Sequence, residues 1–328
     1  MTGFVAPLRF MSLLASTLAI CPSAAMADTF PNAPVRIVVT FPPGGGADSV
    51  ARLIAQQLAL RLKQPVVVDN RAGANGSIGA ASVAKGAADG YTLLLTDRGA
   101  LGINPSLYRS LPYDPLKDFT YVGIAAHSPY VLVQRANLAP RKMSELAAMA
   151  KSSPCQLNYA SFGQGSLPQL GMEALNTRYG ACITHVPYKG GGPALAAVVS
   201  GEVDLALLAL GPAVPQIKSG RIVPLAVGGQ KRSALLAQVA TTAEQADSAD
   251  LFPATWFGFA YPRQTSPAIV SRMSGEIRAV LQQPEIRKRL QEDGYEPGLA
   301  DAQEMTAAVV ADVTRFAGEL GRLGIKPE

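Results

Sequence analysis

Short apolar runs that lead through a glycine-containing loop into a helical pattern recur along this chain. The first begins with the β-branched run 35–39, crosses two prolines and the glycines 44–46, and continues as a helix. The loop either makes only a tight turn or lies against a ligand, and three consecutive glycines exceed what a turn needs. Asp48 or Ser49 can cap the helix, whose first N–H groups suit an anion. The unit therefore predicts a strand, a ligand loop and a helix.

The next segments continue the alternation of strands and helices. Apolar runs at 65–70 and 91–95 are typical of buried strands, and a short helix is expected at 77–85. Such an alternation predicts a parallel sheet with helices on its faces, where ligands bind beyond the carboxyl ends of the strands. That edge of the sheet should bring together the loop 41–48 and the segment 96–100.

A second alternation of the same kind follows between residues 157 and 208, with its own glycine-rich loops after the strands. Two α/β domains of this kind can face each other across a cleft. We expect residues 28–126 and 254–328 in the first lobe and residues 127–253 in the second. The chain then crosses the boundary twice, which favours hinge motion.

The N-terminus has the pattern of a secretory signal peptide at residues 1–27. Arg9 precedes an apolar stretch at 10–20, and small residues follow up to Ala27, after which we expect cleavage. The apolar stretch is too short for a membrane anchor. A lipoprotein site at Cys21 is disfavoured because bulky Ile20 precedes it.

Export leaves Cys155 and Cys182 in an oxidising compartment, each just before a predicted strand of one βαβ unit. The two are either a disulfide, which we favour, or two buried free thiols. The mature chain contains only two histidines, His127 and His185, so no metal or other cofactor is expected.

The charge pattern excludes a nucleic-acid-binding class. The formal net charge of the 328 residues is +5, only 16% of residues are charged, and Lys and Arg are scattered. A hydrophobic content of 48% supplies a substantial core for two domains.

Several segments, in this order and spacing, carry a resemblance to a known family. They are VRIVVTFPPGGGAD (35–48), QPVVVDNRAGA (64–74), DGYTLL (89–94), INP (103–105), LPYD (111–114), HVPYKG (185–190), GEVD (201–204) and WFG (256–258). Together they resemble the tripartite tricarboxylate transporter receptors, also called the Bug family of periplasmic solute-binding proteins. The resemblance covers essentially the whole mature chain.

The resemblance implies a two-lobed α/β fold of the periplasmic-binding-protein (Venus flytrap) type, each lobe a mainly parallel sheet flanked by helices. It also implies a monomer that captures a small carboxylated solute and delivers it to membrane permease subunits. A receptor that signals to a membrane kinase is an open alternative. An enzyme of the same shape is disfavoured, because no Gly-x-Ser-x-Gly motif is present and neither histidine has an evident nucleophile partner.

In this family a ligand carboxylate is held by backbone groups and waters at two facing loops, which correspond to 41–48 and 161–166 here. The candidate ligand-binding residues are Phe41, Gly44, Gly45, Gly46, Asp48, Thr96, Asp97, Arg98, Ser161, Gly163, Gln164, Gly165, Ser166, Tyr188 and Leu208. The chain lacks several polar residues that are common in family pockets, which predicts a solute more apolar than citrate or an amino acid. Arg98 could pair with a carboxylate and Asp97 with an amine or hydroxyl, or the two could satisfy each other or the solvent.

Overall fold

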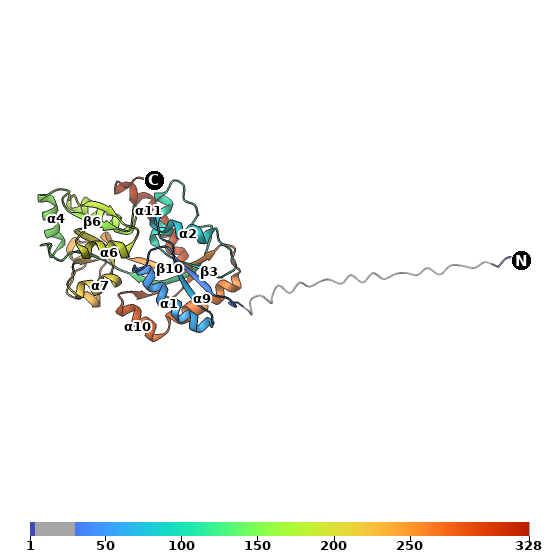
Figure 1. Ribbon diagram of the computed structural model, residues 1–328. Helices are drawn as coiled ribbons and strands as arrows, with labels where there is room; N and C mark the ends of the chain where they lie inside the picture. Colours follow the sequence, from blue (N-terminus) through green and yellow to red (C-terminus); the bar gives the residue numbers. More distant parts are fainter. Residues whose placement is uncertain (4–29, 328) are drawn as a thin grey trace.

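The structure is a computed structural model that describes residues 1–3 and 30–327. It consists of two α/β halves side by side, with α1, α2, α9 and β3 in one and α4, α6, α7 and β6 in the other (Figure 1). The predicted signal peptide, apart from residues 1–3, and its cleavage after Ala27 lie outside the described residues.

The first half is built on a six-stranded sheet in the order β11-β4-β10-β3-β1-β2. Its strands are β1 (Val35–Val39), β2 (Val66–Asn70), β3 (Thr92–Asp97), β4 (Phe119–Ser128), β10 (Thr255–Pro262) and β11 (Glu296–Pro297). The second half is built on a five-stranded sheet in the order β7-β6-β8-β5-β9. Its strands are β5 (Tyr130–Arg135), β6 (Asn158–Ser161), β7 (Thr184–Pro187), β8 (Leu205–Ala209) and β9 (Ile222–Val227).

The predicted α/β class with two lobes is confirmed, but the sheets are mixed and not mainly parallel. β1 pairs in parallel with β2 and β3, and β6 with β7 and β8, whereas β10 and β5 are antiparallel to both of their neighbours. Parallel pairing needs a crossover connection, usually a helix. β5 follows β4 after Pro129 alone and enters the other sheet, so its pairing is not set by a βαβ unit.

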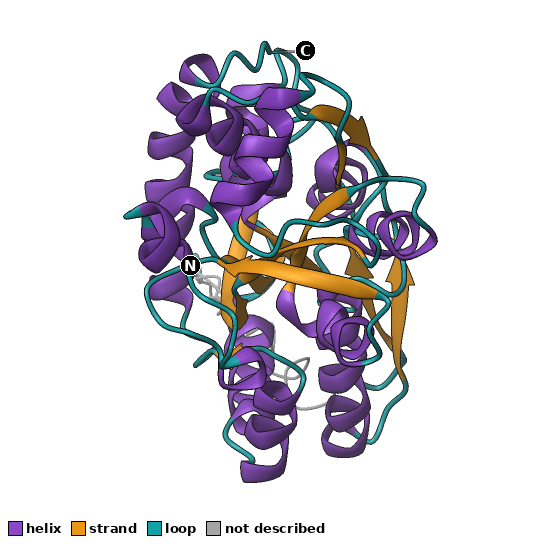
Figure 2. Ribbon diagram, turned by 90° about the vertical axis from the view of Figure 1, so that its left-hand side faces the viewer, coloured by secondary structure: helices purple, strands orange, loops and turns teal. Residues whose placement is uncertain are grey.

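Helices cover both faces of each sheet, as the purple ribbons around the orange strands show (Figure 2). In the first half, apolar residues of α1 (Gly46–Leu62), α9 (Pro267–Leu281) and α10 (Pro284–Glu292) pack on one face, and those of α2 (Ser77–Ala84) and α11 (Ala302–Arg322) on the other. In the second half, the two faces are covered by α4 (Met143–Ser152), α5 (Leu167–Tyr179) and α8 (Thr242–Ala246), and by α6 (Gly191–Ser200) and α7 (Leu210–Lys218).

The last helix, α11, contacts the cores of both halves. Met305 and Val309 pack in the first half, whereas Phe316 and Leu320 pack in the cluster that includes Leu132 of the second sheet. The short helix α3 (Asn104–Leu107) also contributes Leu107 to that second cluster. The two halves are therefore joined by packed helices as well as by the crossing strands.

The predicted disulfide between Cys155 and Cys182 is confirmed, with Cα atoms 4.7 Å apart. The N–H of Cys155 also donates to the carbonyl of Cys182 at 2.9 Å. In the chain-entropy account, a closed loop of this length stabilises the fold by about 3 kcal/mol.

Among the described residues, no helix is long and apolar enough to cross a membrane.

Candidate functional site

A narrow cavity of about 30 Å³, called the inner cavity below, lies between the two halves. Its walls come from the loops after β1 and β6, the ends of β3 and β8, the start of β5, a residue of β10, and the first turns of α6 and α7. The lining residues are Phe41, Gly45, Gly46, Ala47, Asp97, Tyr130, Phe162, Gly191, Leu195, Leu208, Ala209, Pro212 and Phe257.

The N-terminal ends of α1 and α6 face each other at this cavity. A Cβ placed on Gly45, which precedes α1, would lie 3.7 Å from the nitrogen of Gly192 and 3.9 Å from that of Gly191. The first N–H groups of a helix have no partner within the helix, and the helix dipole adds positive charge there. Two such ends, one from each half, make a site suited to an anion.

Asp48 fixes the shape of the loop before α1. Its carboxylate accepts hydrogen bonds from the N–H of Gly44 at 3.1 Å, from Asn70 Nδ2 at 3.0 Å and from Arg52 Nε at 3.0 Å. Burial alone would raise the pKa of Asp48, but the hydrogen bonds from Arg52, Asn70 and Gly44 outweigh it and lower that pKa. Asp48 therefore shapes the loop from behind while Gly45 and Gly46 line the cavity.

The loop 161–166, predicted as the facing cradle, satisfies much of its own hydrogen-bonding capacity. Ser166 Oγ accepts from the N–H of Phe162 at 3.2 Å and donates to the carbonyl of Gly163 at 2.7 Å. The N–H of Gly165 donates to Gln169 Oε1 at 2.6 Å. From this loop Phe162 lines the inner cavity, and the glycines at the start of α6 occupy the position opposite α1.

The walls of the inner cavity are mostly apolar, and Asp97 is the one ionisable carboxylate among its lining residues. Asp97 is 5% exposed, and its Oδ1 accepts from the N–H of Ala100 at 3.1 Å. Burial raises the pKa of Asp97 to about 7, against the opposing effect of the N–H groups of Ala100 and Gly99. The side chain can thus be neutral or charged near neutral pH.

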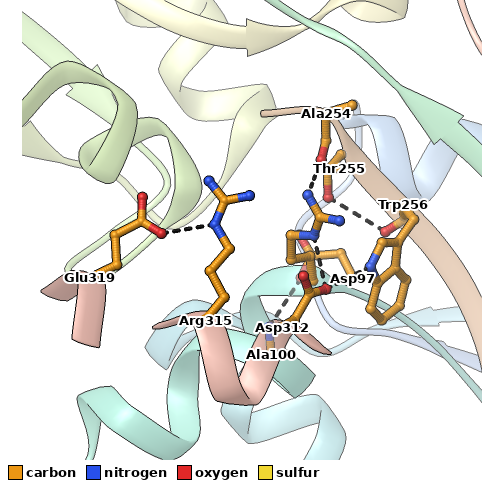
Figure 3. A network of polar contacts seen from close by, with 9 residues as sticks. Asp97, Ala100, Ala254, Thr255, Trp256, Asp312, Arg315 and Glu319 are labelled. Carbon is orange, nitrogen blue, oxygen red and sulfur yellow. Dashed lines mark hydrogen bonds and ion pairs between the residues drawn. The ribbon is translucent and has the colours of Figure 1, made fainter. Parts of the chain in front are cut away.

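Arg98 forms hydrogen bonds with Asp312 and Ala254, which are labelled in Figure 3 together with Trp256. Its Nε donates to Asp312 Oδ2 at 2.9 Å, and its Nη1 donates to the carbonyl of Ala254 at 2.6 Å. Trp256 Nε1 donates to the same oxygen of Asp312 at 3.0 Å. Arg98 therefore connects the end of β3 with α11 and with the segment that enters β10.

A second hollow of about 330 Å³, called the outer pocket below, opens beside the inner cavity. The first half contributes Gly73, Ala74, Asn75 and Tyr108, and the second half contributes Phe162, Gly163, Gln164, Pro187, Tyr188 and Lys189. Phe162 lines both hollows.

The structure thus distributes the candidate residues over three places. Phe41, Gly45, Gly46, Asp97 and Leu208 line the inner cavity, and Gly163, Gln164 and Tyr188 line the outer pocket. The remaining candidates, which line neither hollow, are Gly44, Asp48, Thr96, Arg98, Ser161, Gly165 and Ser166. Ligand contact by any of them stays a prediction.

Ala47 and Phe162 line the inner cavity and lie within the predicted loops 41–48 and 161–166, although neither was singled out as a candidate. The lining residues that sequence reasoning missed altogether are Tyr130, Gly191, Leu195, Ala209, Pro212 and Phe257. A signal for Gly191 was present, because the run Gly190 to Gly192 follows a strand as the glycines 44–46 do. The apolar residues carried no such signal, since they read as ordinary core.

Within residues 1–3 and 30–327, no group of three or more His, Cys, Asp or Glu side chains is arranged to bind a metal ion.

Comparisons with known proteins agree with this architecture. Residues 50–322 match the model of the tripartite tricarboxylate transporter family receptor. Protein BugT of Bordetella pertussis is 35% identical over 92% of each chain. The solved periplasmic binding protein BugD is 30% identical, with a TM-score of 0.87 over 91% of this chain and 100% of that one.

Two further solved structures contain carboxylates. An R. palustris protein solved with adipate is 36% identical, with a TM-score of 0.86 over 91% of this chain and 100% of that one. MatC from Rhodopseudomonas palustris, with bound malate, is 32% identical, with a TM-score of 0.83 over 89% of this chain and 100% of that one. The chain therefore belongs to the tripartite tricarboxylate transporter receptor family, whose members are periplasmic solute-binding proteins.

Proposed function

We propose that this receptor captures a small organic acid between its two halves, with the carboxylate at the facing N-terminal ends of α1 and α6. The observation that carries this proposal is the approach of Gly45 to the nitrogens of Gly191 and Gly192 beside the inner cavity. Relatives solved with adipate and malate support the same solute class.

The solute has an apolar body, because aromatic and aliphatic side chains such as Phe41, Phe257 and Leu208 form most of the cavity wall. Asp97 accepts a hydrogen bond from the solute when charged and donates one when neutral. Arg98 acts mainly within the protein, because Asp312 and Ala254 already engage its guanidinium group.

Calorimetric titration of the mature chain with aliphatic and aromatic acids tests the proposal. Each acid is paired with its neutral amide of the same shape, so that only the charge differs. We expect measurable binding of at least one acid and at least a tenfold weaker affinity for its amide, which corresponds to about 1.4 kcal/mol. Equal affinity of an acid and its amide would exclude an anion site at the helix ends.

In cells, the receptor acts in the periplasm after cleavage behind Ala27 and delivers the solute to membrane permease subunits as a monomer. Residues 28–126 with 254–328, and residues 127–253, are the proposed lobes that close on the solute, and the end of α11 stays with the second lobe because Phe316 and Leu320 pack in its core. Solution scattering should show compaction only with a bound acid. Loss of acid uptake on deletion of the gene supports delivery, whereas unchanged uptake with a lost transcriptional response supports the sensor alternative.

We propose binding without turnover. Ser161 Oγ lies 2.5 Å from His185 Nε2, which invites comparison with a nucleophile and its base. Ser161 is fully buried, however, and burial lowers the pKa of His185 to about 4. Both features disfavour a reactive hydroxyl, and chromatography of an acid after incubation with the protein should recover it unchanged.

A further inference from the structure

Asp97 brings a carboxyl group into the cavity that is proposed to hold the carboxylate of the solute. It is the last residue of β3 and pairs across the sheet with Phe257 of β10. Side chains of directly opposed residues point to the same face of a sheet. The ring of Phe257 would lie 2.9 Å from a Cβ placed on Gly46, at the start of α1. Asp97 is therefore fixed by a strand on the face where this helix end lies.

The inner cavity is too small to keep two carboxylates apart. Its volume of about 30 Å³ has room for about two water-sized groups, which is about the size of one carboxylate. A solute carboxylate at the facing helix ends is therefore a close neighbour of Asp97. Little water fits between the two groups, so their charges are poorly screened.

The surroundings of Asp97 compensate its negative charge only in part. Its Oδ1 accepts from the N–H of Ala100 at 3.1 Å, which supplies a hydrogen bond without a full positive charge. The next residue, Arg98, directs its guanidinium group to Asp312 and to the carbonyl of Ala254 (Figure 3). The charge of Arg98 is thus paired with Asp312 at 2.9 Å.

The titratable side chains that face Asp97 from other elements, among the described residues, are Asp312 of α11, Tyr130 of β5 and Tyr113 of the segment before β4. Burial raises the pKa of Asp97 to about 7, and the negative charge of Asp312 adds to this shift. Burial, with a smaller effect of the Asp97 charge, also raises the pKa of both tyrosines, which stay neutral at neutral pH. Asp97 is therefore the lining residue that can change its charge.

We propose that Asp97 makes solute capture proton-linked, so that the receptor takes up one proton from the solvent onto this carboxyl group when it binds an acid. The proposal rests on the function proposed above and adds the ionic form of the site that binds. When Asp97 is neutral, the helix ends carry a single anion, to which the carboxyl group can donate a hydrogen bond. When Asp97 is charged, two like charges share the cavity, which weakens binding by about 100-fold.

Calorimetric titration of the mature chain with acids that range from acetate and benzoate to suberate tests this linkage. Each titration is run at about pH 6 and about pH 8 in two buffers that differ in ionisation enthalpy, so that the difference in heat gives the number of protons taken up. We expect an uptake of about 0.1 proton at pH 6 and about 0.8 at pH 8. The affinity should be about tenfold weaker at pH 8 than at pH 6.

Asp97→Asn removes the ionisable group and keeps the shape of the side chain. We expect its proton uptake at pH 8 to fall below about 0.2 and its affinity to change less than about twofold between pH 6 and pH 8. His127→Gln is the matched control, because His127 lies outside the inner cavity and burial lowers its pKa from the usual value near neutral pH. This control should keep the proton uptake and the pH dependence of the wild type.

If the wild type binds an acid equally well at both pH values and takes up no proton, the linkage is refuted and the carboxylate proposal stands. Proton uptake that persists in Asp97→Asn, or that is lost in His127→Gln, refutes the assignment to Asp97. If circular dichroism shows that Asp97→Asn does not fold, the wild type and His127→Gln carry the test. Failure of the wild type to bind any of these acids at either pH overturns both proposals.

Discussion

Adding one methyl group at Gly192 should impair closure of the two halves without destabilising either. A Cβ at this position would lie 2.6 Å from the carbonyl oxygen of Pro43, and 3.5 Å from the carbonyl carbon of Gly44. The first distance is short of ordinary contact by about 0.8 Å, and the obstacle is backbone that cannot rotate away. The halves must therefore separate to accommodate Gly192→Ala.

The expected loss of acid affinity follows from the cost of overpacking, which is about 1–3 kcal/mol and destabilises only the closed form. Acid affinity should therefore fall by about 5- to 150-fold. Gly192 lies in the first turn of α6 and its φ is outside the left-handed region. Replacing glycine with alanine there should leave the free energy of unfolding unchanged or raise it by up to about 1 kcal/mol.

Titration calorimetry with a cognate acid measures the affinity, solution scattering measures the compaction, and chemical denaturation measures the free energy of unfolding. Gly275→Ala in α9 is the control for helix propensity, because nothing lies within 4 Å of its Cβ position. Unchanged affinity and unchanged compaction in Gly192→Ala would show that the halves do not close at Gly192 when the acid binds.

Three further outcomes follow from the described contacts. Arg98→Ala should lower the free energy of unfolding by about 1–3 kcal/mol, because Asp312 loses its ion-pair partner, and should change acid affinity less than about threefold. Chemical denaturation measures the first quantity and titration calorimetry the second. Lost affinity at unchanged stability would instead make Arg98 a ligand-binding residue. Replacing Cys155 and Cys182 with serine should lower the free energy of unfolding by about 3 kcal/mol and leave acid affinity intact, which the same two measurements decide. The pKa of Asp97 is raised to about 7 in the fold, so the folded state binds more protons than the unfolded state between about pH 4 and pH 7. The contribution of Asp97 to stability is therefore largest at low pH and is lost as the pH rises through 7. Chemical denaturation between about pH 4 and pH 7 should show that the free energy of unfolding falls more steeply with pH for the wild type than for Asp97→Asn.

The sequence was sufficient for the strands and helices between residues 35 and 95, because apolar periodicity and glycine-rich turns are local signals. It did not indicate α7 (Leu210–Lys218), whose Pro212 and Pro215 argue against a helix. Pro212 lies in its first turn, where a missing N–H costs little. The direction of β5 and β10 was also hidden, since pairing across two sheets depends on distant residues.

For the site, local patterns located loops but not the partners of their polar groups. Arg98 and Asp312 are 214 positions apart, and no spacing in the sequence connects them. The glycines and serines of 161–166 have the composition of an anion cradle, but Gln169 and Ser166 accept hydrogen bonds from that loop's own N–H groups. Only the folded chain shows that the run Gly190 to Gly192 faces the first loop.

A crystal structure of the mature protein with a bound acid would show directly whether the carboxylate lies between the facing ends of α1 and α6. We expect a carboxylate oxygen within about 2.7–3.2 Å of the nitrogens of Gly46 or Ala47 and of Gly191 or Gly192, directly or through one water. A bound acid whose carboxylates all lie away from the ends of α1 and α6 would contradict it.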